Sequence, residues 1–156
     1  MDLATTSDIV TDAITAFGLQ AKDSAHFADV MATASSNANT NVSMLGESFK
    51  YIAPVAGSLG YSVEDTAVAL GLMANSGIKA SQAGAGLRAA LTNMVKPTDT
   101  MQEVMDKYHL SLTNTDGSMK SLSEVMEMLR TKMGNLSEAE QASSAAALFG
   151  KEAMSG

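Results

Sequence analysis

The sequence predicts an all-α fold of seven or eight helices, and three observations favour this fold class. Apolar residues recur at intervals of three and four along most of the chain, which places them on one face of a helix. Aromatic residues make up only 4% of the chain while methionine reaches 12 residues, and a core of small, flexible side chains suits closely packed helices. Cap and turn residues divide the pattern into segments of roughly 10–17 residues, a normal length for globular helices.

Two helices are expected before residue 41. The apolar face of the first carries Val10, Ala13, Ile14 and Phe17. Gly18 is its expected stop. The second begins at Asp23 or Ser24 as its cap, and its apolar face carries Phe27, Val30, Met31 and Ala34. Residues 35–41 are Ser and Asn with few exceptions, and these side chains compete for backbone hydrogen bonds, so a loop is predicted there.

The central helices follow. Asn41 is the predicted cap of a helix whose apolar face carries Leu45, Phe49, Ile52, Ala56 and Leu59. Pro54 lies inside this pattern and predicts a kink or break near Ala53. Ser62 is the cap of the next helix, whose residues 67–74 are apolar on all sides and predict a helix that is buried all round. Gly77 is its expected end.

Four further elements complete the prediction. Ser81 is expected to open a helix that Pro97 ends, and a short helix spans residues 101–108. Residues 110–120 alternate around the turn sequence Asn-Thr-Asp-Gly and predict a small β-hairpin or an ordered loop. Two capping boxes, Ser121 with Glu124 and Ser137 with Glu140, open the last helices, the second of which carries Phe149 on its apolar face.

Length and charge limit the possible classes of protein. A chain of 156 residues predicts one helical module over 1–156, with a possible subdivision into 1–97 and 98–156. The net charge of −7 and the absence of a basic stripe argue against specific nucleic-acid binding. Residues 30–98 carry only three acids and four bases between two acidic flanks, so this segment is expected to be well buried or to contact a partner. The longest apolar run is too short to span a membrane.

No arrangement of reactive residues predicts catalysis, a cofactor or a metal ion. His26 lies beside Asp23 and Ser24, but neighbours within one helical turn do not make a catalytic triad, which is built between elements. The run from Gly84 to Ala89 (GAGLRA) matches a relaxed dinucleotide fingerprint, yet it lacks the strand before it, and close helix packing is the favoured interpretation. We therefore expect no enzyme, no small-molecule substrate and no cofactor.

A set of ordered blocks resembles a known family. These blocks are ASSNANTN at 34–41, LGESFKY at 45–51, APVA at 53–56, LGLMAN at 70–75, SQAG at 81–84, LR at 87–88 and KP at 96–97, flanked by DIVTDA at 8–13 and LFGKEA at 148–153. Together they are similar to the core region of phage tail tape measure proteins. Eight residues in or near these blocks are the candidate packing or interaction residues, namely Leu45, Phe49, Tyr51, Ile52, Tyr61, Met73, Leu87 and Arg88.

The resemblance implies a structural role. Such proteins are long and mostly helical, assemble as a few copies inside the growing tail, set its length, contact tail-tube and tail-tip proteins, and take part in DNA delivery. The implied locations are the virion tail and, during assembly, the host cytoplasm. As one straight helix 156 residues would span only ~230 Å, so the chain is expected to be a folded module of a much longer protein. The alternatives are a cell-wall hydrolase or a membrane-active module used in phage entry.

Overall fold

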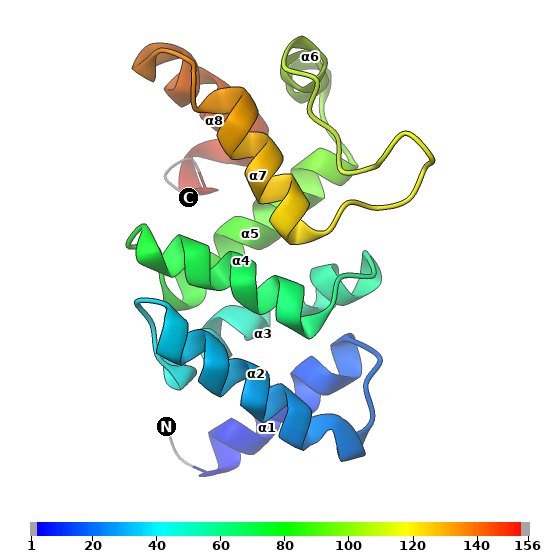
Figure 1. Cartoon of the computed structure of the whole chain (residues 1–156), viewed down its shortest axis with the longest axis vertical. Coiled ribbons are helices and arrows are strands. Elements are labelled where there is room, and N and C mark those ends of the chain that lie inside the picture. The colour runs from blue at the N-terminus through cyan, green and yellow to red at the C-terminus, as the bar shows by residue number, and fades with distance from the viewer. Residues whose placement is uncertain (1–2, 154–156) are drawn as a thin grey trace.

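Polar caps and apolar stripes divide the chain into helices much as the sequence predicts. The computed structural model describes residues 3–153, and within them it has eight α-helices, one short 3₁₀ helix and no β-strand. The elements are α1 (Leu3–Ala16), η1 (Ala21–Asp23), α2 (Ser24–Asn37), α3 (Val42–Ser58), α4 (Val63–Asn75), α5 (Ala80–Val95), α6 (Asp99–Lys107), α7 (Leu122–Met133) and α8 (Glu138–Ala153). The helices stack in an elongated body, with α1 and α2 at one end and α6 and α8 at the other (Figure 1). The all-α prediction is confirmed.

The predicted helix starts form because side chains satisfy backbone amides that have no partner within the helix. The Asn41 side-chain oxygen accepts a hydrogen bond from the Met44 amide at 2.9 Å, and the Ser62 hydroxyl accepts from the Asp65 amide at 3.1 Å. Ser121 opens α7 in a complete capping box with Glu124. Gly77 follows the end of α4 with a φ of 90°, a left-handed conformation that glycine adopts without strain.

Several boundaries differ from the prediction. Helix α2 continues to Asn37 because the side chains of Ser35, Ser36 and Asn37 bond back to carbonyls three and four residues earlier, so the loop is shorter than 35–41. Of the kink or break predicted near Ala53, the break is absent, since α3 runs through Pro54 and keeps buried residues on both sides of it. Residues 110–120 form an ordered loop with one isolated antiparallel bridge between Thr113 and Met119.

The centre of the core lies where α3 crosses α5. A Cβ atom added to Gly84 of α5 would lie 2.2 Å from the carbonyl oxygen of Ser48, so only glycine permits this approach of the two backbones. The Ser48 hydroxyl also donates to the Ala80 carbonyl at 2.7 Å. The packing prediction for the GAGLRA run is thus confirmed at Gly84. Phe49 of α3 is fully buried and packs edge-on against Phe27 of α2, with ring centroids 5.3 Å apart.

Candidate interaction surface

Helix α4 lies between α2 on one side and α5 and α7 on the other, and it is not buried all round. Its inner face packs into the core through residues such as Leu70 and Met73. On its outer face the side chains of Val68 and Leu72 are 49% and 46% exposed. The prediction of an all-buried helix is therefore wrong, because the neighbouring helices cover the inner face and the flanks of α4 and leave its outer face open. Val68 and Leu72 stand one turn apart and form a ridge, which we call the α4 ridge.

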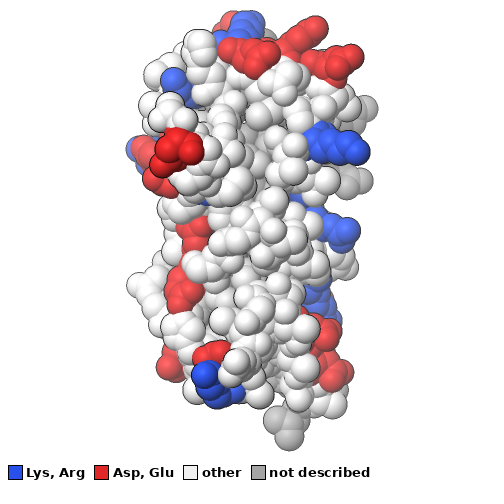
Figure 2. All heavy atoms as spheres, turned by 90° about the vertical axis from the view of Figure 1, so that its right-hand side faces the viewer, with Lys and Arg blue, Asp and Glu red and all other residues white. Residues whose placement is uncertain are grey.

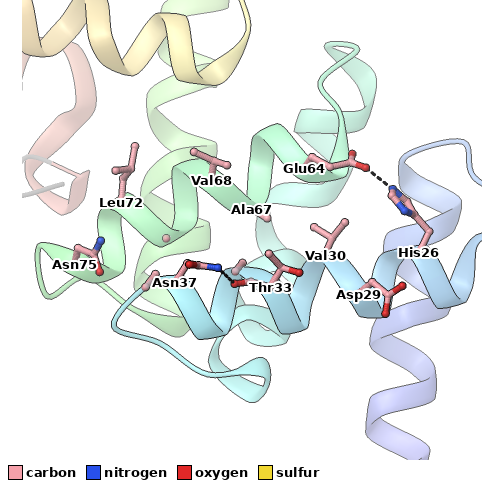
Figure 3. A pocket seen from close by; sticks show the side chains of 13 residues that line it. His26, Asp29, Val30, Thr33, Asn37, Glu64, Ala67, Val68, Leu72 and Asn75 are labelled. Carbon is pink, nitrogen blue, oxygen red and sulfur yellow. Dashed lines mark hydrogen bonds and ion pairs between the residues drawn. The ribbon is translucent and has the colours of Figure 1, made fainter.

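A groove of about 510 Å³ separates the α4 ridge from α2. Figure 3 shows Val30, Thr33 and Asn37 of α2 along one wall, with Val68 and Leu72 along the other. Ala67 and Gly71 lie at the groove too, and a Cβ atom added to Gly71 would lie 3.2 Å from the Ala38 Cβ. The small residues Ala67 and Gly71 of α4 and Ala38 after α2 thus line the groove together with the larger apolar side chains. We call this cavity the α2–α4 groove.

Polar contacts tie the two helices together at both ends of the α2–α4 groove. At one end the side chain of His26 of α2 hydrogen-bonds to the carboxylate of Glu64 of α4, and both side chains are about half exposed. The pKa of Glu64 is lowered by a hydrogen bond from its own backbone amide and then by the contact with His26. At the other end the amide of Asn39 donates to the side-chain oxygen of Asn75 at 2.8 Å.

The charged residues that line the α2–α4 groove are mostly acidic. Asp29 and Glu64 are the carboxylates, and His26 is the one residue that can carry a positive charge among the residues at this groove in the described part of the chain. Figure 2, which shows a side face of the molecule, has charged groups at the ends and along the edges and uncharged atoms in the middle. The charge-poor segment 30–98 reaches the surface, since it carries the exposed apolar residues Val42, Tyr51, Val68, Leu72 and Val95.

A second groove, of about 700 Å³, lies on the other side of the α4 ridge, toward α5 and α7. Met126 and Leu129 of α7 face it, and Arg130 forms an ion pair with Glu127 at 3.8 Å along its edge. We call this second cavity the α4–α7 groove. Because Val68 and Leu72 line both grooves, the ridge and its two grooves form one continuous apolar surface.

Asp65 is a positioning residue that the sequence did not reveal. Its carboxylate accepts hydrogen bonds from the backbone amide of Leu122, from the amide of Ser123 at 3.1 Å and from the Ser123 hydroxyl at 3.0 Å. These bonds satisfy amides at the start of α7 and fix that helix against α4. In the sequence Asp65 is part of the first turn of its own helix, and nothing there signals a partner 57 residues away.

The eight candidate residues from the sequence divide into two groups. Six lie in the core, namely Leu45, Phe49, Ile52, Tyr61, Met73 and Leu87. Tyr51 is 40% exposed on α3, and Arg88 is exposed on α5. Of the eight, Met73 and Leu87 line the α4–α7 groove, whereas the ridge residues Val68 and Leu72 were not among the candidates. The Tyr61 hydroxyl is buried without a hydrogen-bond partner, and burial together with the nearby Asp65 raises its pKa.

The arrangement of His26, Asp23 and Ser24 is not that of a catalytic triad. The Asp23 carboxylate accepts from the Gln20 amide at 2.8 Å, and the Ser24 hydroxyl donates to the Ala21 carbonyl at 2.6 Å, while His26 turns to Glu64. Across residues 3–153 no cluster of three or more metal-ligating side chains is present. Within the same range, none of the helices has both the length and the apolarity to cross a bilayer. The predicted packing of Phe149 falls on a side chain outside the described residues.

Known proteins place the chain in a family. Residues 1–150 match the model of the phage-related minor tail protein family. The tape measure protein of Pneumococcus phage Dp-1 is 39% identical over 155 residues, and the probable tape measure protein of Escherichia phage P2 is 27% identical over 142 residues. These alignments cover 99% and 90% of this chain but only 14% and 17% of the two relatives. No solved structure has significant similarity to the chain.

The two relatives are named as tape measure proteins, and neither name describes an enzyme. The ordered sequence blocks, the all-α fold and the match along almost the whole chain agree with one another. The chain belongs to the phage-related minor tail protein family and is similar to one segment of the much longer tape measure proteins.

Proposed function

We propose that this segment is a folded contact module of a tape measure protein, which binds other proteins during tail assembly. The observation that carries the proposal is the α4 ridge with its two apolar grooves, in a chain of the phage tail family. Large apolar side chains grouped on a surface are typical of protein interaction sites. Six described residues are large, apolar and well exposed, and two of them, Val68 and Leu72, form this ridge.

The proposed partners are other copies of the protein and the proteins of the tail tube and tail tip. Assembly takes place in the host cytoplasm, and the product is the virion tail. Length determination and a role in DNA delivery are proposed for the whole parent protein, of which this chain is equivalent to about a seventh in the relative from phage Dp-1. In this proposal the compact module does not measure length; it anchors the parent to its partners.

The test is a double substitution, Val68→Asp and Leu72→Asp, in the full-length parent during phage production. Because both side chains project from the ridge, the variant should fold while losing its apolar contact surface. We expect the yield of complete tails, counted by electron microscopy, to fall at least tenfold. Val95→Asp is the matched control, since Val95 is 51% exposed on α5 and lines neither groove. Normal tails from the double variant, with normal infectivity, would refute a contact role for this surface.

A further inference from the structure

The shape of the α2–α4 groove matches the side chains of one more helix. Val30 and Ala34 on α2, and Val68 and Leu72 on α4, are pairs separated by four residues. Such pairs form ridges along each helix with a space between them. A third helix with large apolar side chains at the same four-residue spacing can place them in that space. The volume of about 510 Å³ has room for several such side chains.

The charges of the groove specify the polar part of its occupant. Asp29 and Glu64 lie at the end of the groove where α2 and α4 begin, and neither Lys nor Arg is among the groove-lining residues that the structure describes. His26 is already paired with Glu64. The amides Asn37 and Asn75 line the opposite end. A helix that brings Lys or Arg to the Asp29 end therefore meets unbalanced negative charge, while its other end meets neutral groups.

The same charges disfavour a second copy of this chain as the occupant. This segment has a net charge of −7, the same sign as the groove, so a second copy of the segment is a poor electrostatic match for this groove, whatever contacts copies make elsewhere. An interface between two α2–α4 faces also brings a second set of Asp29 and Glu64 carboxylates into the desolvated surface. Lys22 does not offset these carboxylates at the groove, because it lies in the 3₁₀ helix before α2 and is not among the residues that line the groove.

We propose that the α2–α4 groove binds a basic amphipathic α-helix of another protein of the tail. This proposal rests on the contact role proposed above and names the partner's chemistry at that surface. The helix inserts large apolar side chains, one turn apart, between Val30 and the α4 ridge. A Lys or Arg about one turn beyond them pairs with Asp29 and Glu64. The mode is a helix in a groove, in which apolar anchors supply affinity and a charged contact sets the direction of binding.

Site-specific photocrosslinking in the full-length parent tests this proposal. A photoreactive phenylalanine analogue, benzoylphenylalanine, replaces Leu72, and cells that assemble the phage are irradiated. The crosslinked peptide is then sequenced by mass spectrometry. The matched control carries the same group at Val95, which is exposed to the same degree away from both grooves. A second strain combines the Leu72 probe with Asp29→Lys and Glu64→Lys, and a third combines it with Asp99→Lys and Glu103→Lys on α6 as a charge-matched control.

The expected product is a crosslink to a segment of a different polypeptide with apolar residues three or four apart and at least one Lys or Arg in the next turn. Charge reversal at Asp29 and Glu64 should lower its yield at least fivefold, whereas reversal on α6 should not. A crosslink to the parent itself, a partner segment without basic residues, or a yield no greater than that from Val95 would overturn the proposal. Loss of tails in the Val68→Asp, Leu72→Asp variant with an unchanged crosslink after charge reversal would leave the contact role standing and refute only the basic helix.

Discussion

The α3–α5 pair and the α2–α4 pair are both built with glycine and alanine, yet they pack in opposite ways. Between α3 and α5 the backbones are so close that no Cβ fits at Gly84. At Gly71 of α4 an added Cβ would meet only the side chain of Ala38, the residue that follows α2, and a groove lies between α2 and α4. Small residues thus permit tight packing in the core between α3 and α5, whereas between α2 and α4 they line an open groove.

The largest expected difference between the two regions comes from removing one apolar side chain in each. Phe49→Ala should lower the free energy of unfolding by about 3–5 kcal/mol, because Phe49 is fully buried and its loss leaves a cavity among Phe17 and Phe27. Leu72→Ala should cost less than about 1 kcal/mol, since half of the side chain is already in water. Urea denaturation of both variants measures the difference. Similar losses for the two would mean that the α4 ridge is part of the core.

A second comparison adds one methyl group to each pair. Gly84→Ala should cost about 1–3 kcal/mol or more, because the new Cβ overlaps the Ser48 carbonyl oxygen and the two helices must separate. Gly71→Ala should change stability by less than about 1 kcal/mol, because the gain in helix propensity offsets a tight contact with Ala38. Thermal unfolding monitored by circular dichroism distinguishes them. If the Gly84 variant unfolds at the wild-type temperature, the close approach of α3 and α5 is not what holds this core together.

Local patterns in the sequence predicted the closed core better than the open surface. The caps at Asn41, Ser62 and Ser121 depend on residues three positions apart, which a sequence displays directly. The run of residues 67–74 showed that α4 is apolar on all sides, but periodicity does not say how many neighbours a helix has. Exposure of Val68 and Leu72 depends on where α2 and α7 lie, and the position of α7 depends on Asp65, a contact between distant segments.

The boundary errors have a related cause. Residues 35–37 were predicted as loop from the tendency of Ser and Asn to compete with the backbone, whereas here their side chains bond to carbonyls of the same helix. At Pro54 the prediction followed from the general tendency of proline inside a helix to kink or break it. The fully buried residues Ile52 and Ala56 on either side of Pro54 anchor both halves of α3 to the core. At Pro54 tertiary packing outweighs a local preference, whereas at residues 35–37 the Ser and Asn side chains make local hydrogen bonds within the helix itself.

The hydrogen bonds from the start of α7 to Asp65 give a prediction with a smaller and more local effect. Asp65→Ala removes the carboxylate that accepts from the amides of Leu122 and Ser123, and loss of such a cap costs about 1–2 kcal/mol. Amide hydrogen exchange should accelerate in α7 and much less in α3 or α5. Glu124→Ala is the control, because it removes a capping contact within α7 and leaves the bonds to α4 in place. Unchanged exchange in α7 of the Asp65 variant would show that this helix is held by its apolar contacts alone.

The smallest expected effect is a pH dependence at the mouth of the α2–α4 groove. The folded state lowers the pKa of Glu64, so the folded protein favours the charged carboxylate. The resulting stability is present above the ordinary glutamate pKa and is lost as pH falls through the lowered value. Because the His26–Glu64 pair is half exposed, its contribution should stay below about 0.5 kcal/mol. Glu64→Gln should therefore lower the urea midpoint slightly at pH 7 and not at all near pH 3, whereas Glu103→Gln on α6 should do neither. An equal deficit for Glu64→Gln at both pH values would mean that the amide fails to replace the carboxylate for steric reasons, and that charge at this end does not hold α2 and α4 together.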